Sequence, residues 1–216
     1  MDVSFDAISE PVPTRVTSGL AKIGAVLKSR AWKGAGPAGV TPTQAQALEL
    51  LRGRPASLGG LAALLGVSTA TASTAVGTLV TKGLVVKEPG ANKRSVTLRL
   101  TEAGEAVADR ASEWPGFLSR AVENFDDAEQ AAMLLLLVKL IRTLQLNGDI
   151  PPQRTCVTCR YFRPRVHEDP VNPHHCAYLD APFGDRHLRL DCPEQADADA
   201  EQQQRAWERF TSATPA

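Results

Sequence analysis

A pair of short helices joined by a tight turn is the feature of this sequence that most constrains its fold. In "ASLGGLAALLGVSTATASTAVGTLVTKGLV", residues 56–85, apolar side chains recur at helical spacing on both sides of residues 66–68. The Ser68 hydroxyl is suited to cap the second helix, and residues 82–83 are suited to end it. The first apolar stripe consists of Leu58, Leu61, Leu64 and Leu65, and the second of Ala72, Val76, Leu79 and Val80.

A hairpin is predicted directly after these helices. The candidate strands "LVVKE" and "SVTLRLT" are separated by the turn-forming stretch "PGANKR", which carries Lys93 and Arg94 at its tip. Two short helices followed by a hairpin form the order of a winged helix-turn-helix, in which the second helix enters the major groove of DNA.

Longer helices are predicted on both sides of this segment. Residues 15–33 have an apolar stripe that ends at "GAGPAG", and Pro42 lies near the start of another helix. A helix from Thr101 is broken or bent near Pro115. The longest helix is capped by Asp126 or Asp127, ends at Gly148, and contains Met133, Leu134, Leu137, Ile141 and Leu144. The fold is therefore expected to be mainly α with a small β-hairpin wing.

Residues from about 41 to 147 resemble the MarR family of bacterial transcription regulators. The matching phrases are "TPTQAQALELL", "LAALLGVSTATASTAVGTLVTKGLV" and "LRLTEAG", in the family's order and at its distances. The resemblance implies a dimeric repressor that binds a double-stranded DNA operator. It also implies a homodimer formed by intertwined first and last helices, and in many members a small aromatic effector. The apolar stripes of residues 16–27 and 133–144 suit such a helical dimerisation region.

The expected DNA contacts are short hydroxyls on the second helix and cations on the wing. Hydroxyls bond to phosphates and base edges, and residues 57–99 contain five cationic side chains against one anionic, a local surplus of four. Residues 92–94 are Asn-Lys-Arg where the family usually has an Asp-Arg pair, and the second helix contains no arginine. The candidate contacts are Ser68, Thr69, Thr71, Ser73, Thr74, Thr78, Lys93 and Arg94.

The four cysteines all lie in the last third of the chain, as Cys-x2-Cys-x16-Cys-x15-Cys. The N-terminus is acidic and unlike a signal peptide, and the longest strongly apolar run, "MLLLLV", is too short to cross a bilayer. A cytoplasmic protein without membrane contact is expected, and there clustered cysteines favour metal or redox chemistry over stable disulfides. Four thiolates suit either a [4Fe-4S] cluster or tetrahedral zinc. The candidate ligands are Cys156, Cys159, Cys176 and Cys192.

The spacing favours the iron–sulfur cluster. Zinc ribbons usually have two close cysteine pairs, and this segment has one. "CVTCRYF…HHCAYLDAPFGDRHLRLDC" resembles the cluster segment of high-potential iron–sulfur proteins, which implies that Tyr161, Phe162, Tyr178 and Phe183 wall the cluster. Zinc is the alternative, with His174 or His175 as a possible replacement ligand. Redox disulfides or a metal-free module also remain open.

These patterns divide the chain into four parts and favour a regulator over an enzyme. The expected parts are a dimerisation and DNA-binding domain (1–147), a linker (148–154), a small loop-rich metal-binding module (155–195) and a marginal helix or disordered tail (196–216). The chain has no nucleophile–His–acid set, phosphate loop or paired-carboxylate motif, so an enzyme or electron carrier is the less favoured reading. The cysteine module is expected to control DNA binding. With a purely structural zinc, a small aromatic ligand would be the signal instead.

Overall fold

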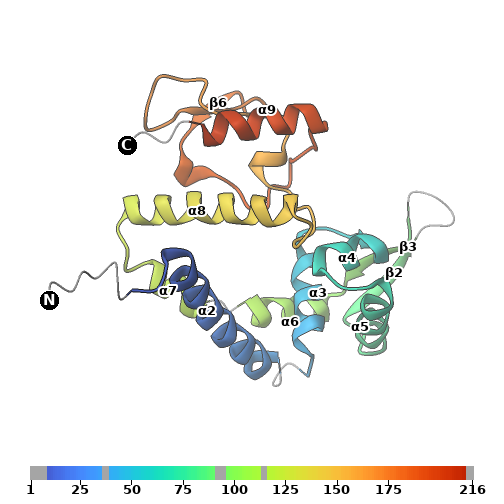
Figure 1. Ribbon diagram of the computed structural model, residues 1–216. Coiled ribbons are helices and arrows are strands. Elements are labelled where there is room, and N and C mark those ends of the chain that lie inside the picture. Colours follow the sequence, from blue (N-terminus) through green and yellow to red (C-terminus); the bar gives the residue numbers. More distant parts are fainter. Residues whose placement is uncertain (1–8, 36–38, 91–95, 113–115, 213–216) are drawn as a thin grey trace, which may run out of the picture. The chain divides into compact units, whose positions relative to one another are not determined.

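The computed structural model describes residues 9–35, 39–90, 96–112 and 116–212 (Figure 1). Contacts divide the chain into two compact units. The first comprises Met1–Leu61 and Thr69–Leu118, and the second comprises Ala62–Ser68 and Ser119–Ala216.

The helices of the first unit begin and end close to the predicted positions. They are α2 (Val12–Ala35), α3 (Pro42–Gly53), α5 (Thr69–Thr81) and α6 (Glu102–Ser112), while the short helices α4 (Leu58–Leu65) and α7 (Gly116–Val122) cross from one unit to the other. A capping box explains the start of α3. The Gln44 N–H donates to Thr41 Oγ1 at 3.3 Å, and the Thr41 N–H donates to Gln44 Oε1 at 3.0 Å.

A three-stranded antiparallel sheet is formed by the hairpin that follows α5 and by a short strand that precedes α4. The predicted hairpin is present as β2 (Val85–Pro89) and β3 (Val96–Leu100), with Val85 opposite Leu100. The two-residue strand β1 (Ala56–Ser57) pairs with the other edge of β3, which gives the order β1-β3-β2. This third strand was not predicted, because two residues carry no periodicity.

The first unit has a core of buried side chains, and a close backbone contact joins the wing to α6. Buried side chains come from α3, α5, β3 and α6, among them Leu48, Leu79, Leu98 and Ala108. Gly104 brings the first turn of α6 so close to the Leu84 carbonyl oxygen that an added Cβ would clash with it. A glycine is therefore required at the end of the "LRLTEAG" phrase, because there is no space for a side chain.

The buried face of α5 is turned slightly from the predicted one. Ala72, Val76 and Leu79 are buried as predicted. Ala75 is buried as well, whereas Val80 is only half-buried. The prediction of Val80 as a core residue was wrong, because helical spacing places it at the edge of the face that Ala72, Ala75, Val76 and Leu79 bury.

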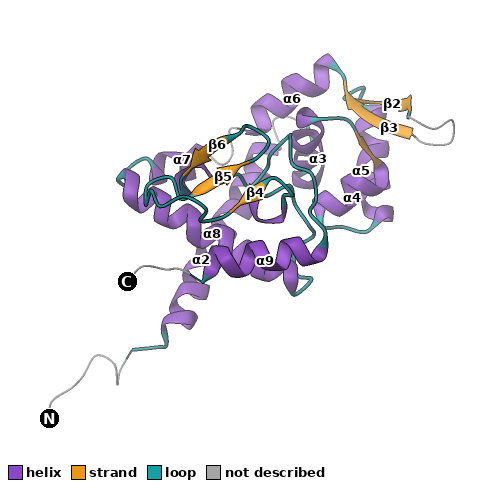
Figure 2. Cartoon of the chain, turned by 90° about the horizontal axis from the view of Figure 1, so that it is seen from above, coloured by secondary structure: helices purple, strands orange, loops and turns teal. Residues whose placement is uncertain are grey.

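The second unit combines one long helix with a small sheet. Asp126 caps α8 (Asp127–Leu146) by accepting from the N–H groups of Ala128 and Glu129, both at 2.9 Å. Strands β4, β5 and β6 lie side by side in that order (Figure 2). Their bounds, with those of the 3-10 helices and the last helix, are β4 (Phe162–Arg163), β5 (His174–Cys176), β6 (Ala181–Phe183), η1 (Cys156–Thr158), η2 (Asp185–His187) and α9 (Ala200–Thr211).

Helix α9 completes the core of the second unit. Phe210 has no exposed surface, and Trp207 packs against the same core. Asp199 caps the helix by accepting from the Gln202 N–H at 2.7 Å. The segment expected to be a marginal helix or disordered is thus a capped helix over Ala200–Thr211 that the module needs for its packing. No single helix in the described part of the chain is long and apolar enough to cross a membrane; only the bent pair α4 and α5 taken together reaches that length and composition.

Candidate functional site

The outer face of α5 carries the hydroxyls predicted to contact DNA. Thr69, Thr71, Ser73 and Thr74 are exposed on the helix, and Ser68 is exposed just before it. Thr78 is half-buried. The spacing of the buried residues explains this arrangement, since a helix that buries every third or fourth side chain exposes those between.

Two of these hydroxyls also bond to their own helix. Thr74 Oγ1 donates to the Ala70 carbonyl at 3.1 Å, and Thr78 Oγ1 donates to the Thr74 carbonyl at 3.2 Å. Each hydroxyl oxygen keeps its acceptor capacity toward a base edge. The predicted wing-tip contacts, Lys93 and Arg94, lie outside the described residues.

The cationic side chains near α5 differ in their bonding partners within the protein. Arg99 Nε donates to Glu88 Oε2 at 3.0 Å, which neutralises it along the wing. Lys82 Nζ donates to the Gly39 carbonyl and fixes the end of α5. Lys87 is exposed on β2. The surplus of four is unchanged, because Glu88 is already counted in it, and Lys87 is the better placed of these three cations for a phosphate.

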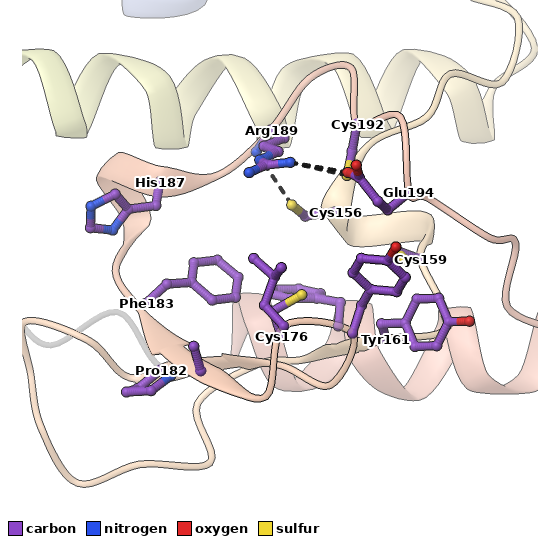
Figure 3. A pocket seen from close by; sticks show the side chains of 14 residues that line it. Cys156, Cys159, Tyr161, Cys176, Pro182, Phe183, His187, Arg189, Cys192 and Glu194 are labelled. Atoms are coloured by element: carbon purple, nitrogen blue, oxygen red, sulfur yellow. Dashed lines mark hydrogen bonds and ion pairs between the residues drawn. The ribbon is translucent and has the colours of Figure 1, made fainter.

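All four cysteines line one cavity of about 290 Å³ in the second unit (Figure 3). Cys156 opens η1 and Cys159 follows it, with the Cys159 N–H donating to the Cys156 carbonyl at 2.9 Å. Cys176 ends β5, and Cys192 lies in the loop after η2. The η1 turn brings Cys156 and Cys159 together, and the four predicted ligands line one cavity; their binding of a metal stays a prediction.

Backbone hydrogen bonds hold the cysteine segments against one another. The Cys156 N–H donates to the Arg189 carbonyl at 3.1 Å, and the Cys192 N–H donates to the Arg154 carbonyl at 2.9 Å. Arg154 also donates from Nε and Nη2 to the two carboxylate oxygens of Asp191, at 2.7 and 2.8 Å. The loop with Cys192 is thereby fixed to the chain just before Cys156.

The walls of the cavity are largely aromatic. Tyr161, Phe162, Tyr178 and Phe183 all line it. Phe162 and Phe183 also stack on each other, with ring centroids 5.9 Å apart. The lining residues that sequence reasoning missed are Leu179, Ala181, Pro182, His187, Arg189 and Glu194. The position of His187 and Arg189 in "DRHLRLDC", close to Cys192, was the only signal for them.

Two of the thiols receive hydrogen bonds from one residue. The Arg189 backbone N–H donates to Cys156 Sγ at 3.3 Å, and Arg189 Nη1 donates to Cys192 Sγ at 3.6 Å. Burial raises the pKa of the Cys156 thiol to about 11, against the lowering effect of the Arg189 N–H. The Cys192 sulfur in turn raises the pKa of Arg189. A cationic group bound to these half-buried cysteines would favour their thiolate form.

The arrangement of the thiols and the size of the cavity bear on which metal group could be proposed for it. Within the described residues, no group of three or more His, Cys, Asp or Glu side chains is arranged to hold a metal ion. Tetrahedral zinc, with Zn–S bonds of about 2.3 Å, requires thiolates about 3.8 Å apart. In a cubane cluster each cysteine binds a different iron, so its thiolates lie further apart around a shared space. The volume of about 290 Å³ also far exceeds the ~10–15 Å³ that one water needs.

The histidines proposed as replacement zinc ligands have other partners. His174 is fully buried; its Nδ1 accepts from the Arg165 N–H at 3.2 Å and its Nε2 bonds to Asp185 Oδ1 at 2.8 Å. His175 lies 3.2 Å from both His167 Nε2 and Asp180 Oδ1. Neither histidine lines the cysteine cavity.

The cavity shares its core with α8. Val138 of α8 is buried in one cluster with Val157, Phe162, Leu188 and Phe210. Cys156 and Cys159 pack against this cluster, as do Leu134 and Leu135. Cys156 and Cys159 therefore pack against the same core as one face of α8.

Comparison with known proteins gives matches in the winged segment. Residues 38–95 match a family model described as the MarR family. A MarR-family transcriptional regulator from Silicibacter pomeroyi is similar in structure, with 24% sequence identity, a TM-score of 0.55, and coverage of 66% of this chain and 97% of that chain.

Two other solved structures have lower TM-scores. For transcriptional regulator Tm0710 from Thermotoga maritima the identity is 25%, the TM-score 0.44, and the coverage 62% of this chain and 97% of that one. For the reduced form of MarR from E. coli the identity is 22%, the TM-score 0.48, and the coverage 62% of this chain and 98% of that one. Comparison with curated proteins gives no match. The family match ends before the cysteines, whose iron–sulfur resemblance stays a prediction. The chain thus matches the MarR family over residues 38–95 and shares, over about two thirds of its length, the fold of a MarR-family transcriptional regulator.

Proposed function

We propose that this protein is a dimeric, sequence-specific DNA-binding transcription regulator, a repressor, whose operator binding is controlled by a [4Fe-4S] cluster in the cysteine pocket. The observation that carries the DNA-binding part is the exposed hydroxyl face of α5, which precedes a hairpin within the MarR-matched segment. The second helix of a winged helix-turn-helix reads the major groove, and short hydroxyls are suited to base edges and phosphates.

Dimer formation is supported by an apolar stripe on α2. Of its residues whose burial is described, only Gly19, Leu27 and Ala31 are half-buried. A helix whose apolar side chains lack packing partners is only marginally stable in water, because packing supplies most of its stability. A partner helix that covers the stripe would supply this packing. The exposed stripe consists of Val12, Val16, Leu20, Ile23 and Val26.

The cluster is supported by the chemistry of the cavity. Four thiols, two of them hydrogen-bonded to Arg189, face a space with aromatic walls. When bound, a cluster would supply a one-electron couple and an oxidation-sensitive bond to each cysteine. The aromatic rings would exclude water from it, and Cys156, Cys159, Cys176 and Cys192 would hold it.

Control of DNA binding would pass through α8. One face of this helix packs against the core that contains Cys156 and Cys159. Another part of its surface exposes Leu136, Leu137 and Leu140, which suits contact with a second copy. Gain or loss of the cluster would change the packed face and bias the dimer between two states, as allosteric control requires.

The test starts with anaerobic purification, a visible spectrum, and iron, sulfide and zinc analysis. We expect brown protein with about four irons and four sulfides per chain. Colourless protein with one zinc per chain would overturn the cluster and favour a structural zinc, with a small aromatic ligand as the signal.

The DNA-binding part is tested separately. Operator fragments selected from random duplexes are titrated with cluster-loaded protein, air-oxidised protein and the Cys176→Ser variant. We expect sequence-selective binding that weakens with salt and differs between the loaded and cluster-free forms. Equal affinities in all three forms would leave a DNA-binding protein without cluster control, and loss of selectivity in all three would overturn the regulator.

A further inference from the structure

We propose that Arg189 and Glu194 are opposing positioning residues that set the reduction potential of the cluster. This inference rests on the proposed function, because it requires the [4Fe-4S] group. Neither residue was a candidate ligand, and both line the cysteine cavity (Figure 3).

Arg189 reaches two of the four sulfurs from one backbone position. Its N–H donates to Cys156 Sγ at 3.3 Å, and its Nη1 donates to Cys192 Sγ at 3.6 Å. The two sulfurs belong to segments that are 36 residues apart in the chain, so a single side chain and its own backbone connect them. The guanidinium is half-exposed, with 49% of the side-chain surface accessible.

Glu194 contacts the same guanidinium nitrogen that bonds to the Cys192 sulfur. Its Oε2 accepts from Arg189 Nη1 at 3.4 Å and lies 3.5 Å from Cys192 Sγ. The carboxylate therefore holds the arginine in place and also brings a negative charge to the sulfur. The charges of the two residues act on the same atom with opposite sign.

With a cluster bound, these residues would influence its reduction by one electron from an external one-electron reductant such as dithionite. No bond of the protein would form or break, and the reduced cluster and its thiolates would carry one more negative charge. N–H donors and a positive charge stabilise this reduced form more than the oxidised form, so they raise the potential. A carboxylate next to the sulfur lowers it. Because both side chains are partly exposed, salt weakens both effects.

The experiment is an anaerobic redox titration of loaded protein, followed by visible and electron paramagnetic resonance spectra. Arg189→Gln removes the guanidinium and keeps the backbone donor. We expect this variant to have a lower reduction potential. The equilibrium constant for reduction should fall about tenfold, which corresponds to about 59 mV for a one-electron couple. Glu194→Gln should shift the potential in the opposite direction. Arg189→Lys should fall between wild type and Arg189→Gln, because it keeps the charge and loses the planar donor.

Arg186→Gln is the matched control. It removes an equal charge from the same module, at a side chain whose Nη2 bonds to Asn172 Oδ1 at 3.5 Å and which does not line the cavity. Its potential should equal that of the wild type. If the Arg189→Gln protein fails to hold the cluster, the Glu194→Gln and Arg189→Lys proteins still show in which direction each charge shifts the reduction potential.

The outcomes separate the two proposals. Intact clusters with unchanged potentials in the Arg189 and Glu194 variants, or shifts of the same sign in both, would overturn this inference and leave the cluster in place. Wild-type protein that holds no iron under any loading condition would overturn the cluster itself, and this inference with it.

Discussion

His174 Nε2 donates a hydrogen bond to Asp185 Oδ1 across 2.8 Å, from an imidazole that has no exposed surface. The tautomer follows from the other ring nitrogen, because Nδ1 accepts from the Arg165 N–H and so cannot carry the proton. The ring also contacts Phe162, Phe183 and Phe210, with centroids 5.4, 5.4 and 5.5 Å away. This pair is the polar centre of the cysteine module.

The His174 hydrogen bond gives the second unit an acid-sensitive stability. It lowers the pKa of Asp185 below its ordinary value of 3.8, more than burial raises it. A carboxyl with a depressed folded-state pKa stabilises the fold above the unfolded pKa, and this stabilisation is lost as the pH falls through the folded pKa. Wild-type protein should therefore lose unfolding free energy below pH 3.8, and Asp185→Asn should lose less over the same range. Urea titrations followed by circular dichroism measure this. If the unfolding free energy fell equally steeply with pH in both proteins, the stabilising role of the His174–Asp185 hydrogen bond would be contradicted.

Phe210 should be the most costly single truncation in α9. The ring is fully buried against Phe162 and His174, and Phe210→Ala should lower the free energy of unfolding of the second unit by about 3–5 kcal/mol. Phe125 is a matched control, since 40% of its surface is exposed, and Phe125→Ala should cost about 0.5 kcal/mol or less. Equal losses for the two variants in denaturant titrations would show that α9 is not part of the cooperative core.

Periodicity predicted the winged segment well and the cysteine module only in part. The helices around residues 66–68 and the hairpin were evident because each buries one face at a regular interval. Helix α9 was underestimated because its sequence is mostly polar, and only Trp207 and Phe210 carry large apolar side chains into the core. The convergence of the cysteines followed from their spacing. The burial of His174 did not, because it depends on partners that lie nine and eleven residues away in the chain.

Gly104 should be intolerant of any side chain. An added Cβ would meet the Leu84 carbonyl oxygen and carbon, both of which are backbone atoms held by the wing, so relief requires the strand and α6 to separate. Gly104→Ala should lower the melting temperature of the first unit markedly. Gly77→Ala in α5 is the control, because nothing lies within 4 Å of its Cβ and alanine favours helix by about 1 kcal/mol. A Gly104→Ala protein as stable as wild type would refute the close approach.

Lys87 should contribute to DNA affinity without contributing to sequence preference. Lys87→Ala is expected to weaken binding to all duplexes and to reduce the salt dependence, log K against log salt, by about one unit. Arg209→Ala removes an exposed cation from α9 and should leave the slope unchanged. Fluorescence anisotropy at several salt concentrations distinguishes these outcomes. An unchanged slope for Lys87→Ala would exclude a phosphate contact at this position.

The stripe on α2 predicts how the dimer can be broken. Ile23→Asp places a charge among apolar side chains that a partner would cover, and should shift sedimentation equilibrium toward monomer and reduce operator affinity together. Lys22→Ala on the same helix should leave the assembly intact. A monomeric wild-type protein, or a dimer that tolerates Ile23→Asp, would show that another surface forms the interface.

The position of α9 after the cysteines has a consequence for how the protein matures. Chains are synthesised from the N-terminus, so all four thiols leave the ribosome before Phe210, the ring that closes the core next to Cys156 and Cys159. During that interval the thiols have no finished enclosure around them. A cofactor held by these thiols would therefore be enclosed by the finished core only after residue 210 has emerged.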